Sequence, residues 1–541
     1  MHAVLPLAFL AGSLSLTACN PSPRTPVESP GDTAEHEPLP PISPTAWVAR
    51  ASIDLRGRRP TLSELDQATD MEAARAMVVQ FADDDELGTR MAWLYDDQLL
   101  TAHYFLNTDV RDWSALDQDT TQAVGWAPLE LMRYIVDEDL ALTSLVTATE
   151  LPRNDSVAHY FELEPPGTGT EWAMMPPPDA RPMAGILSSS ELWFVHDADG
   201  LNYNRHRANA LARMFLCDDM LLRDVTFALD LSIDSLENLE NAVATEPQCT
   251  TCHAALDPLA AFFGGFPDRS VEVSHPGLYR YSTWGETWTS GWTTPSWFGR
   301  PAKDLEEVGH LVAADPRFSR CIIRVFSEGL FASPLEQALG GKMASSTWLD
   351  AQTLAQGAPE NLIGRELVRS LVVDPAYIQG KERVLRPESY PEVLGDLLGL
   401  DPQSSDLQAM AWSTEHRLLG GGLDDFTINE RNPSPGVGHI TLQGWAARAN
   451  TRSALQNDSA RPKTSQVLWT VTEPWATDDA LVRKQLAVWH GRFLSELVDA
   501  DSEEIDRLLG LWHAVGGAED PEIAWATVVE ALIRHPRFLL Y

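Results

Sequence analysis

The sequence predicts a mainly α protein built from several multi-helical domains. Apolar residues recur at the spacing of one helix face, Asp-Pro pairs mark helix starts, and 541 residues are too many for a single core. Asp315-Pro316 and Asp520-Pro521 each supply an N-cap and a first helical residue. The apolar periodicity is clearest in two sets: Ala208, Leu211, Ala212, Phe215 and Leu216, and then Phe318, Ile322, Val325 and Phe326.

The chain is strongly acidic. It carries 40 Lys and Arg residues against 78 Asp and Glu residues, for a formal charge of −38. Such a charge repels phosphate backbones, so we expect no nucleic-acid partner. The acidity would suit a basic redox partner, although a charged, solvated surface is the favoured explanation.

The N-terminus has the pattern of an export signal. Residues 1–18 contain no acidic residue, Lys or Arg, and the apolar run from Ala3 to Leu16 is too short to span a bilayer. Leu16-Thr17-Ala18-Cys19 resembles a bacterial lipoprotein box, in which Cys19 is acylated. We therefore expect a lipoprotein signal peptide over 1–18 and a location in the cell envelope, lipid-anchored on the periplasmic or outer-membrane face. Plain secretion and an uncleaved core helix are the alternatives.

Residues 19–44 form a predicted tether, because eight prolines keep this segment extended and unpacked. No later apolar stretch is long enough to cross a membrane, so the lipid is the expected sole anchor. A helical domain is predicted over 45–165. Its clearest helix start is Thr61 to Glu64, which has the pattern of a capping box.

Three later segments resemble one another, and each follows an apolar helical stretch. These segments begin at Ala314, Val373 and Arg534. They are either related helical units or ordinary signals of helix starts and ends.

The pattern changes from Pro276 to Arg300, where Trp, Thr and Gly predict an irregular or short-stranded excursion.

Cys249-Thr250-Thr251-Cys252-His253 is the strongest chemical motif. Two thiols at this spacing can each add to a haem vinyl group, and the adjacent imidazole can then bind the iron as proximal ligand. With 5 Cys and 14 His residues, the motif has a chance expectation of roughly one in a thousand. We expect one covalent haem c. A thiol pair or disulfide and a zinc site are the alternatives. The apolar residues Leu256, Leu259, Phe262, Phe263 and Phe266 are expected to wall the porphyrin or to pack as ordinary core.

The segment from Glu246 to Leu259 resembles the centre of the planctomycete-type cytochrome c family, a cassette of exported bacterial domains. Ile53-Asp54-Leu55-Arg56-Gly57, Ala184-Gly185-Ile186-Leu187 and Asp315-Pro316-Arg317-Phe318 follow the same order of modules. The resemblance covers roughly Ala51 to Leu339. It implies a haem c cassette over 181–345, followed by a C-terminal helical domain over 346–541, and it implies no settled reaction.

Two cysteines remain once Cys19 is assigned to lipid and two others to haem. Cys217 and Cys321 would lie in an oxidising compartment and on apolar helix faces, so we expect both thiols to point inward and to pair. Two separate buried thiols are the alternative.

Electron transfer to a redox partner protein or to a small electron donor or acceptor is the expected function. The same haem could instead serve a redox enzyme with an open distal site, and a lipoprotein with a structural haem could act as a scaffold. The sixth ligand would separate these functions. The sequence does not choose among the candidates: Met343, Met220, Met174, Met175, His206 and His310.

Overall fold

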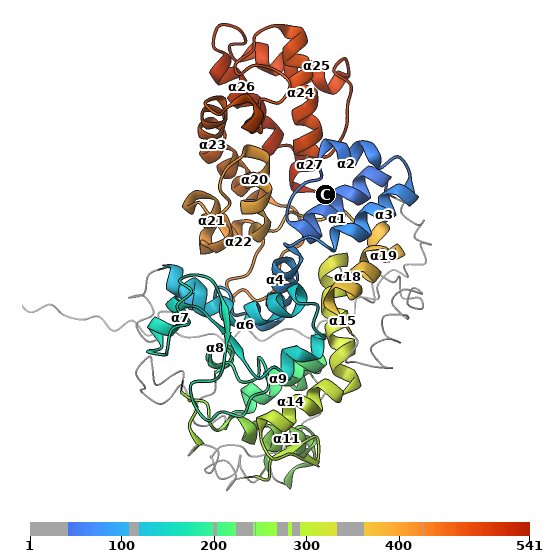
Figure 1. Cartoon of the computed structure of the whole chain (residues 1–541). Coiled ribbons are helices and arrows are strands. Elements are labelled where there is room, and N and C mark those ends of the chain that lie inside the picture. Colours follow the sequence, from blue (N-terminus) through green and yellow to red (C-terminus); the bar gives the residue numbers. More distant parts are fainter. Residues whose placement is uncertain are drawn as a thin grey trace, which may run out of the picture. The chain divides into compact units, whose positions relative to one another are not determined.

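The chain is mainly helical, as predicted, in a computed structural model that describes residues 42–107, 118–197, 203–222, 242–243, 245–267, 280–283, 293–332, 362–425 and 427–541 (Figure 1). The predicted signal peptide, Cys19 and nearly all of the tether lie outside these residues. Within them, no helix has the length and apolarity required to cross a membrane.

The N-terminal helices begin at local capping signals. Ser43 caps α1, so Pro44, the end of the predicted tether, is the first residue of a helix. The predicted capping box is confirmed: the Thr61 hydroxyl accepts the Glu64 N–H at 3.2 Å, and the Glu64 carboxylate accepts the Thr61 N–H at 2.7 Å. These helices are α1 (Pro44–Arg56), α2 (Leu62–Gln67), α3 (Met71–Phe81) and α4 (Leu87–Leu99).

A mixed segment follows, in which a long helix packs against α4 and against a small antiparallel sheet. The two strands pair Leu151 with Met175 and Arg153 with Ala173. The elements are α5 (Tyr104–Asn107), α6 (Gln118–Asp137), η2 (Leu142–Val146), β1 (Leu151–Arg153), α7 (Asp155–Tyr160) and β2 (Ala173–Met175).

The region of the predicted haem cassette is again helical. The described end of the Trp- and Gly-rich excursion is a short hairpin, in which Trp297 pairs with Arg300. The elements are α8 (Ser190–Val195), α9 (Arg205–Leu216), η3 (Met220–Leu222), α11 (Pro247–Ala260), η4 (Ala261–Phe263), β3 (Ser296–Trp297), β4 (Arg300–Pro301), α14 (Leu305–Ala314) and α15 (Pro316–Phe331).

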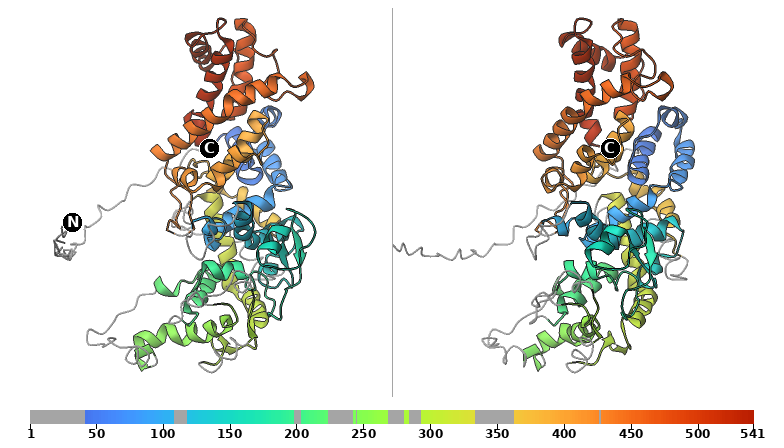
Figure 2. Two further views of the ribbon diagram at one scale, coloured as in Figure 1. Left: turned by 90° about the vertical axis from the view of Figure 1, so that its left-hand side faces the viewer. Right: turned by 60° about the vertical axis from the view of Figure 1, so that its left-hand side comes forward.

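The C-terminal part is a set of packed helices, among which α23 contacts α26 and α24 contacts α25 (Figure 2). The elements are α18 (Gly364–Val372), α19 (Pro375–Ile378), η6 (Pro387–Ser389), α20 (Tyr390–Leu398), α21 (Ser405–Trp412), α22 (Thr414–Leu419), α23 (Val437–Ser459), η7 (Lys463–Ser465), α24 (Asp479–Leu494), α25 (Glu503–Ala514), α26 (Pro521–Ile533) and α27 (Pro536–Leu539).

The three similar segments share one local structure, a helix end followed directly by a capped helix. Asp315, Asp374 and His535 each accept a backbone N–H two residues on with their side chains, and proline follows each of them at the first helical position. This shared capping accounts for the likeness as helix punctuation.

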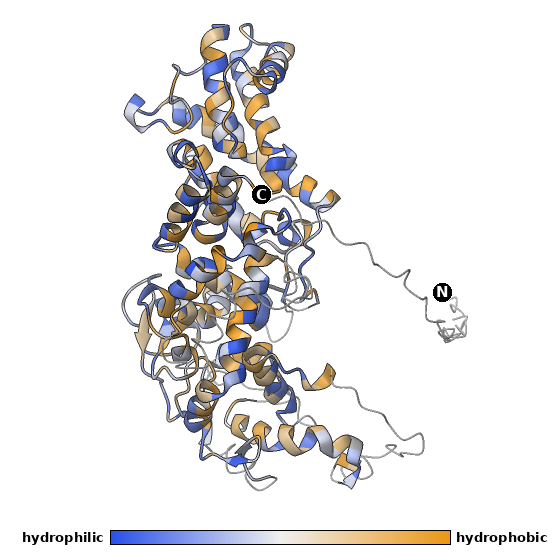
Figure 3. Cartoon of the chain, turned by 90° about the vertical axis from the view of Figure 1, so that its right-hand side faces the viewer, coloured by the Kyte–Doolittle hydropathy of each residue, from blue (hydrophilic) through white to orange (hydrophobic). Residues whose placement is uncertain are grey.

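Two large groups of buried apolar residues form the cores, and hydrophobic and hydrophilic residues alternate along the helices that build them (Figure 3). The first core runs from Trp47 to Tyr377 and includes α18, which contacts α3, α6 and α15, so residues 362–378 belong to this core rather than to that of the C-terminal helices. The second core runs mainly from Leu385 to Leu539. Trp469, Trp489 and Trp525 lie at its centre, with ring centroids 5.0 to 5.4 Å apart.

Candidate haem-binding site

Helix α11 carries all three residues of the Cys-x-x-Cys-His motif (Figure 1). Cys252 and His253 follow Cys249 by three and four positions, so both side chains lie on the same side of the helix as that of Cys249. Both cysteines are half-buried and neither is in a disulfide. Two thiols and an imidazole are thus presented together on a helix whose other contacts include α9 and β3.

A carboxylate one turn further along α11 orients the imidazole. His253 Nδ1 lies 3.0 Å from Asp257 Oδ1, and Arg205 of α9 donates to both oxygens of that carboxylate, at 2.7 and 3.1 Å. Because an ionised carboxylate only accepts hydrogen bonds, the His253 proton resides on Nδ1. The lone pair of Nε2 is therefore left for a metal ion, the arrangement that metal-binding histidines commonly adopt.

The Asp257 carboxylate stays ionised in this arrangement. Burial alone would raise its pKa, but the hydrogen bonds from His253 and Arg205 outweigh burial, and the net result is a pKa below the ordinary value. Arg205 also neutralises the charge of the carboxylate, so the pair fixes the imidazole without adding net charge to the site.

The apolar residues after the motif pack as core, one of the two roles expected for them. All five are at most 6% exposed. Phe263 packs on Trp193 with ring centroids 4.5 Å apart, and Phe266 packs on Tyr281 at 5.1 Å. They hold α11 on the first core and present no free face to a cofactor. The residues concerned are Leu256, Leu259, Phe262, Phe263 and Phe266.

Exposed apolar side chains directly follow Met220, whose main chain lies beside the motif. The main-chain oxygen of Met220 is 4.0 Å from Cys252 Sγ, and the next two residues, Leu221 and Leu222, are 77% and 82% exposed. Large apolar side chains with such exposure are the kind of surface that a porphyrin would cover. The donor set and this apolar neighbour fit a covalently attached haem.

Cys217 and Cys321 lie at disulfide distance, with their sulfur atoms 2.10 Å apart and their Cα atoms 5.2 Å apart. The bond joins the C-terminal end of α9 to α15. Cys321 is buried, but Cys217 is exposed, so the expectation that both side chains point inward is wrong for Cys217. The reason is local: Cys217 is the C-cap of α9 and has a left-handed backbone with φ of 51°, which turns it off the apolar helix face.

The sequence did not lead us to two residues of this site, Asp257 and Arg205. Asp257 was signalled by its position four residues after His253, which is the spacing of neighbours on a helix face. Arg205 precedes Asp257 by 52 residues and had no local signal. Among the candidates for the sixth ligand, Met343 lies outside the described residues. Met220 has its main chain beside Cys252 but its side chain in the first core.

Comparison of the chain with protein-family models, with curated proteins and with solved structures finds no match. The function is therefore argued from the site itself.

Proposed function

We propose that the protein is an exported, lipid-anchored c-type cytochrome of the planctomycete-type family that binds one haem through Cys249, Cys252 and His253 and transfers electrons. One observation carries the proposal: two unpaired thiols and an imidazole share one side of α11, with the Nε2 atom of His253 left free for iron. When bound, haem supplies a one-electron ferric/ferrous couple.

The residues of the chain have separate tasks in this proposal. Cys249 and Cys252 would hold the haem covalently, each through a thioether formed when its S–H adds across one vinyl group, which needs no oxidant. Asp257 holds the proton on Nδ1 of His253 and fixes the plane of the ring. Leu221 and Leu222 offer apolar surface beside Cys252.

A zinc site receives less support from the geometry. Structural zinc requires four protein ligands. Within the described residues, the motif residues belong to no group of three or more His, Cys, Asp or Glu side chains whose ligand atoms converge. The two thiols are also unbonded to each other, which favours neither a structural disulfide nor a closed metal centre.

Haem staining after denaturing electrophoresis tests the attachment. Protein matured in a periplasm that attaches haem c is expected to stain, C249S and C252S to lose most of the stain, and H253A to lose the proximal bond and attach haem poorly. The C217S/C321S variant is the matched control, since it removes two cysteines outside the motif and should stain as wild type does. Equal staining of all variants would overturn the proposal.

Absorption spectra separate a carrier from an enzyme. Sharp reduced bands that do not respond to carbon monoxide or cyanide indicate an electron carrier with both axial positions filled. A high-spin spectrum that shifts with these ligands indicates an open distal site and hence redox catalysis. The acidic surface makes a basic redox protein the partner to test first, with association rates that fall as salt increases.

Fractionation tests the anchor. C19S is expected to move the protein from the membrane fraction to the soluble periplasmic fraction, while the C249S variant, which also loses one thiol, should remain with the membrane. Unchanged fractionation of C19S, with no lipid on the mature terminus, would remove the lipid anchor from the proposal but leave the haem.

A further inference from the structure

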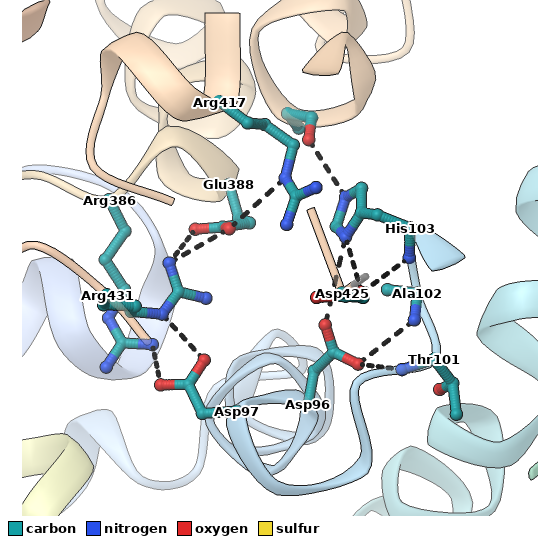
Figure 4. Close-up of polar contacts among 11 residues, drawn as sticks. Asp96, Asp97, Thr101, Ala102, His103, Arg386, Glu388, Arg417, Asp425 and Arg431 are labelled. Atoms are coloured by element: carbon teal, nitrogen blue, oxygen red, sulfur yellow. Dashed lines mark hydrogen bonds and ion pairs between the residues drawn. The ribbon is translucent and has the colours of Figure 1, made fainter. Parts of the chain in front are cut away.

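A second group of metal-ligand side chains lies far from the haem motif in sequence, within the described residues. Asp96 is on α4, His103 follows that helix, and Asp425 is in the loop after α22 (Figure 4). All three are buried: their exposed fractions are 0%, 0% and 4%. One candidate ligand atom from each lies within 4.8 Å of the other two.

Main-chain donors hold one oxygen of each carboxylate. The N–H groups of Thr101 and Ala102 donate to Asp96 Oδ1 at 3.0 and 3.1 Å, and the His103 N–H donates to Asp425 Oδ2 at 2.8 Å. The left-handed backbone of Leu100, with φ of 57°, ends α4 just before these donors. Both carboxylates are therefore fixed in orientation before any ligand binds.

The second oxygen of each carboxylate is buried without a hydrogen-bond partner among the described residues. These atoms are Asp96 Oδ2 and Asp425 Oδ1. Burying an unpaired carboxylate oxygen is costly, so native structures normally supply a donor, a water molecule or a cation. Asp96 Oδ2 lies 3.9 Å from Nδ1 of His103, so it is directed into the cluster but is too distant for a hydrogen bond.

Both imidazole nitrogens of His103 face acceptors. Nε2 lies 3.1 Å from the carbonyl oxygen of Ala411, and Nδ1 lies 3.3 Å from Asp425 Oδ2. With its proton on Nε2 the ring donates to Ala411 and directs the Nδ1 lone pair at the carboxylates, where a cation can take the place of a proton. The ring packs against Trp93 and Trp412, with centroids 5.5 and 4.9 Å away, which limits its rotation.

The surrounding charges leave a deficit of positive charge. Arg431 pairs with Asp97 at 2.7 Å and with Glu388 at 3.1 Å, and Arg386 pairs with Asp97 at 3.3 Å (Figure 4). Arg417 lies 3.8 Å from Glu388. The network holds four carboxyl groups (Asp96, Asp97, Glu388 and Asp425) and three guanidinium groups (Arg386, Arg417 and Arg431), so one carboxyl group has no guanidinium to balance it and requires a proton or a cation.

We propose that Asp96, His103 and Asp425 bind a divalent transition-metal cation, with Zn²⁺ as the representative ion. One imidazole nitrogen and two carboxylates suit such an ion, and because the donors already lie within 4.8 Å of one another, small side-chain movements bring them to ordinary metal-ligand distances of about 2.0–2.2 Å. The Nε2–H bond to Ala411 and the main-chain donors to the carboxylates are outer contacts typical of metal ligands. With three protein residues as ligands, the fourth position of Zn²⁺ would be filled by a second carboxylate oxygen or a water molecule. The bound ion would tie the end of α4 to the loop that carries Asp425.

Metal analysis of the purified full-length chain is the first test. We expect about one equivalent of zinc per chain after growth with zinc, and zinc-dependent refolding of metal-stripped protein. The analysis is repeated in the C249S/C252S variant, so that zinc captured by unoccupied thiols is not counted and failure of the haem proposal leaves this result readable.

D96N is the decisive variant, because its amide oxygen can keep the bonds to Thr101 and Ala102 while the negative charge is lost. We expect its zinc affinity to fall at least about 100-fold and zinc no longer to raise its thermal midpoint. D97N is the matched control: it removes the same charge one residue away, from the ion pairs of Arg386 and Arg431, and should keep its zinc.

Two results would overturn the site. One is a folded wild-type chain that takes up neither Zn²⁺ nor Mn²⁺ nor Fe²⁺, which would assign the position to a proton or a water molecule. The other is D96N that retains as much zinc as D97N. If D96N fails to fold, the metal content of wild type and of C249S/C252S decides the matter without it.

Discussion

The Tyr541 hydroxyl donates a hydrogen bond at 2.9 Å to Asp54, which lies 487 residues earlier in the chain. The other oxygen of Asp54 accepts from the Tyr377 hydroxyl at 2.7 Å and pairs with the buried guanidinium of Arg383. Main-chain bonds between Arg383 and Tyr541 fix the same region. One carboxylate of α1 thus joins three segments that follow it at great distances along the chain.

Asp54→Asn should lower the free energy of unfolding by about 3–5 kcal/mol, because it leaves Arg383 as a buried charge without its partner. Guanidinium unfolding of the full chain measures the loss. Asp66→Asn is the control, since Asp66 is exposed on α2 and should change stability by less than about 0.5 kcal/mol. Equal stabilities of the two variants would show that the ion pair contributes nothing beyond its surroundings.

The Cys217–Cys321 bond should stabilise the fold by roughly 4–5 kcal/mol in the chain-entropy model, because it closes a loop of 104 residues in the unfolded chain. Unfolding is compared with and without a reductant in wild type and in C217A/C321A. Reduction should destabilise wild type and leave the double variant unchanged. Insensitivity of wild type to the reductant, with both thiols then free to alkylation, would contradict the prediction.

Asp257 is predicted to act as a positioning residue for His253, and this prediction depends on the proposed haem. Asp257→Asn keeps an oxygen that can accept from Nδ1 but removes the charge that strengthens the imidazole as a ligand. The reduction potential should rise, by about 59 mV for each tenfold loss of preference for ferric iron. Potentiometry of the haem-loaded protein measures this rise.

Asp218→Asn is the matched control for that shift. Asp218 follows α9 and pairs with Arg317 at 3.4 Å, so the control removes the same charge near the site without touching the bond of His253. An equal rise in both variants would mean that Asp257 acts only through its charge at a distance. The comparison requires that the Asp257→Asn and Asp218→Asn variants each bind as much haem as wild type does.

Local signals in the sequence were sufficient to predict helix starts, but they could not predict contacts between residues far apart in the chain. Thr61 with Glu64, Asp315-Pro316 and Asp520-Pro521 all begin helices, because an N-cap requires only residues two or three positions apart. His103 and Asp425 are 322 residues apart, and no spacing rule links them. Their proximity depends on how α4 and the loop after α22 pack.

The apolar run after the haem motif illustrates a different limit. Phe263 and Phe266 have the same composition whether they line a pocket or fill a core, and only the contacts with Trp193 and Tyr281 distinguish the two. Cys217 was misjudged for a related reason. Periodicity placed it on the apolar face of α9, but the helix ends at that residue and its backbone turns away.

Glu392 on α20 predicts a pH dependence of stability. Burial raises its pKa from 4.5 to about 7, with the charge of Arg90 acting in the opposite direction. Between these values the folded state keeps a proton that the unfolded state has lost, so stability falls as the pH rises through this window and changes no further above about pH 7. The total effect is roughly 3 kcal/mol.

The stability of wild type relative to Glu392→Gln isolates this effect, since other titrating groups are common to both proteins. Measured by guanidinium unfolding from pH 4.5 to 8, the free energy of unfolding of wild type should fall relative to that of the variant between pH 4.5 and 7, and the difference should then stay constant. Glu415→Gln, which alters an exposed residue of α22, should follow wild type at every pH. A difference between wild type and Glu392→Gln that is the same at pH 5 and pH 7 would mean that this carboxyl group is ionised in the folded state throughout, with Arg90 stabilising its charge enough to offset burial.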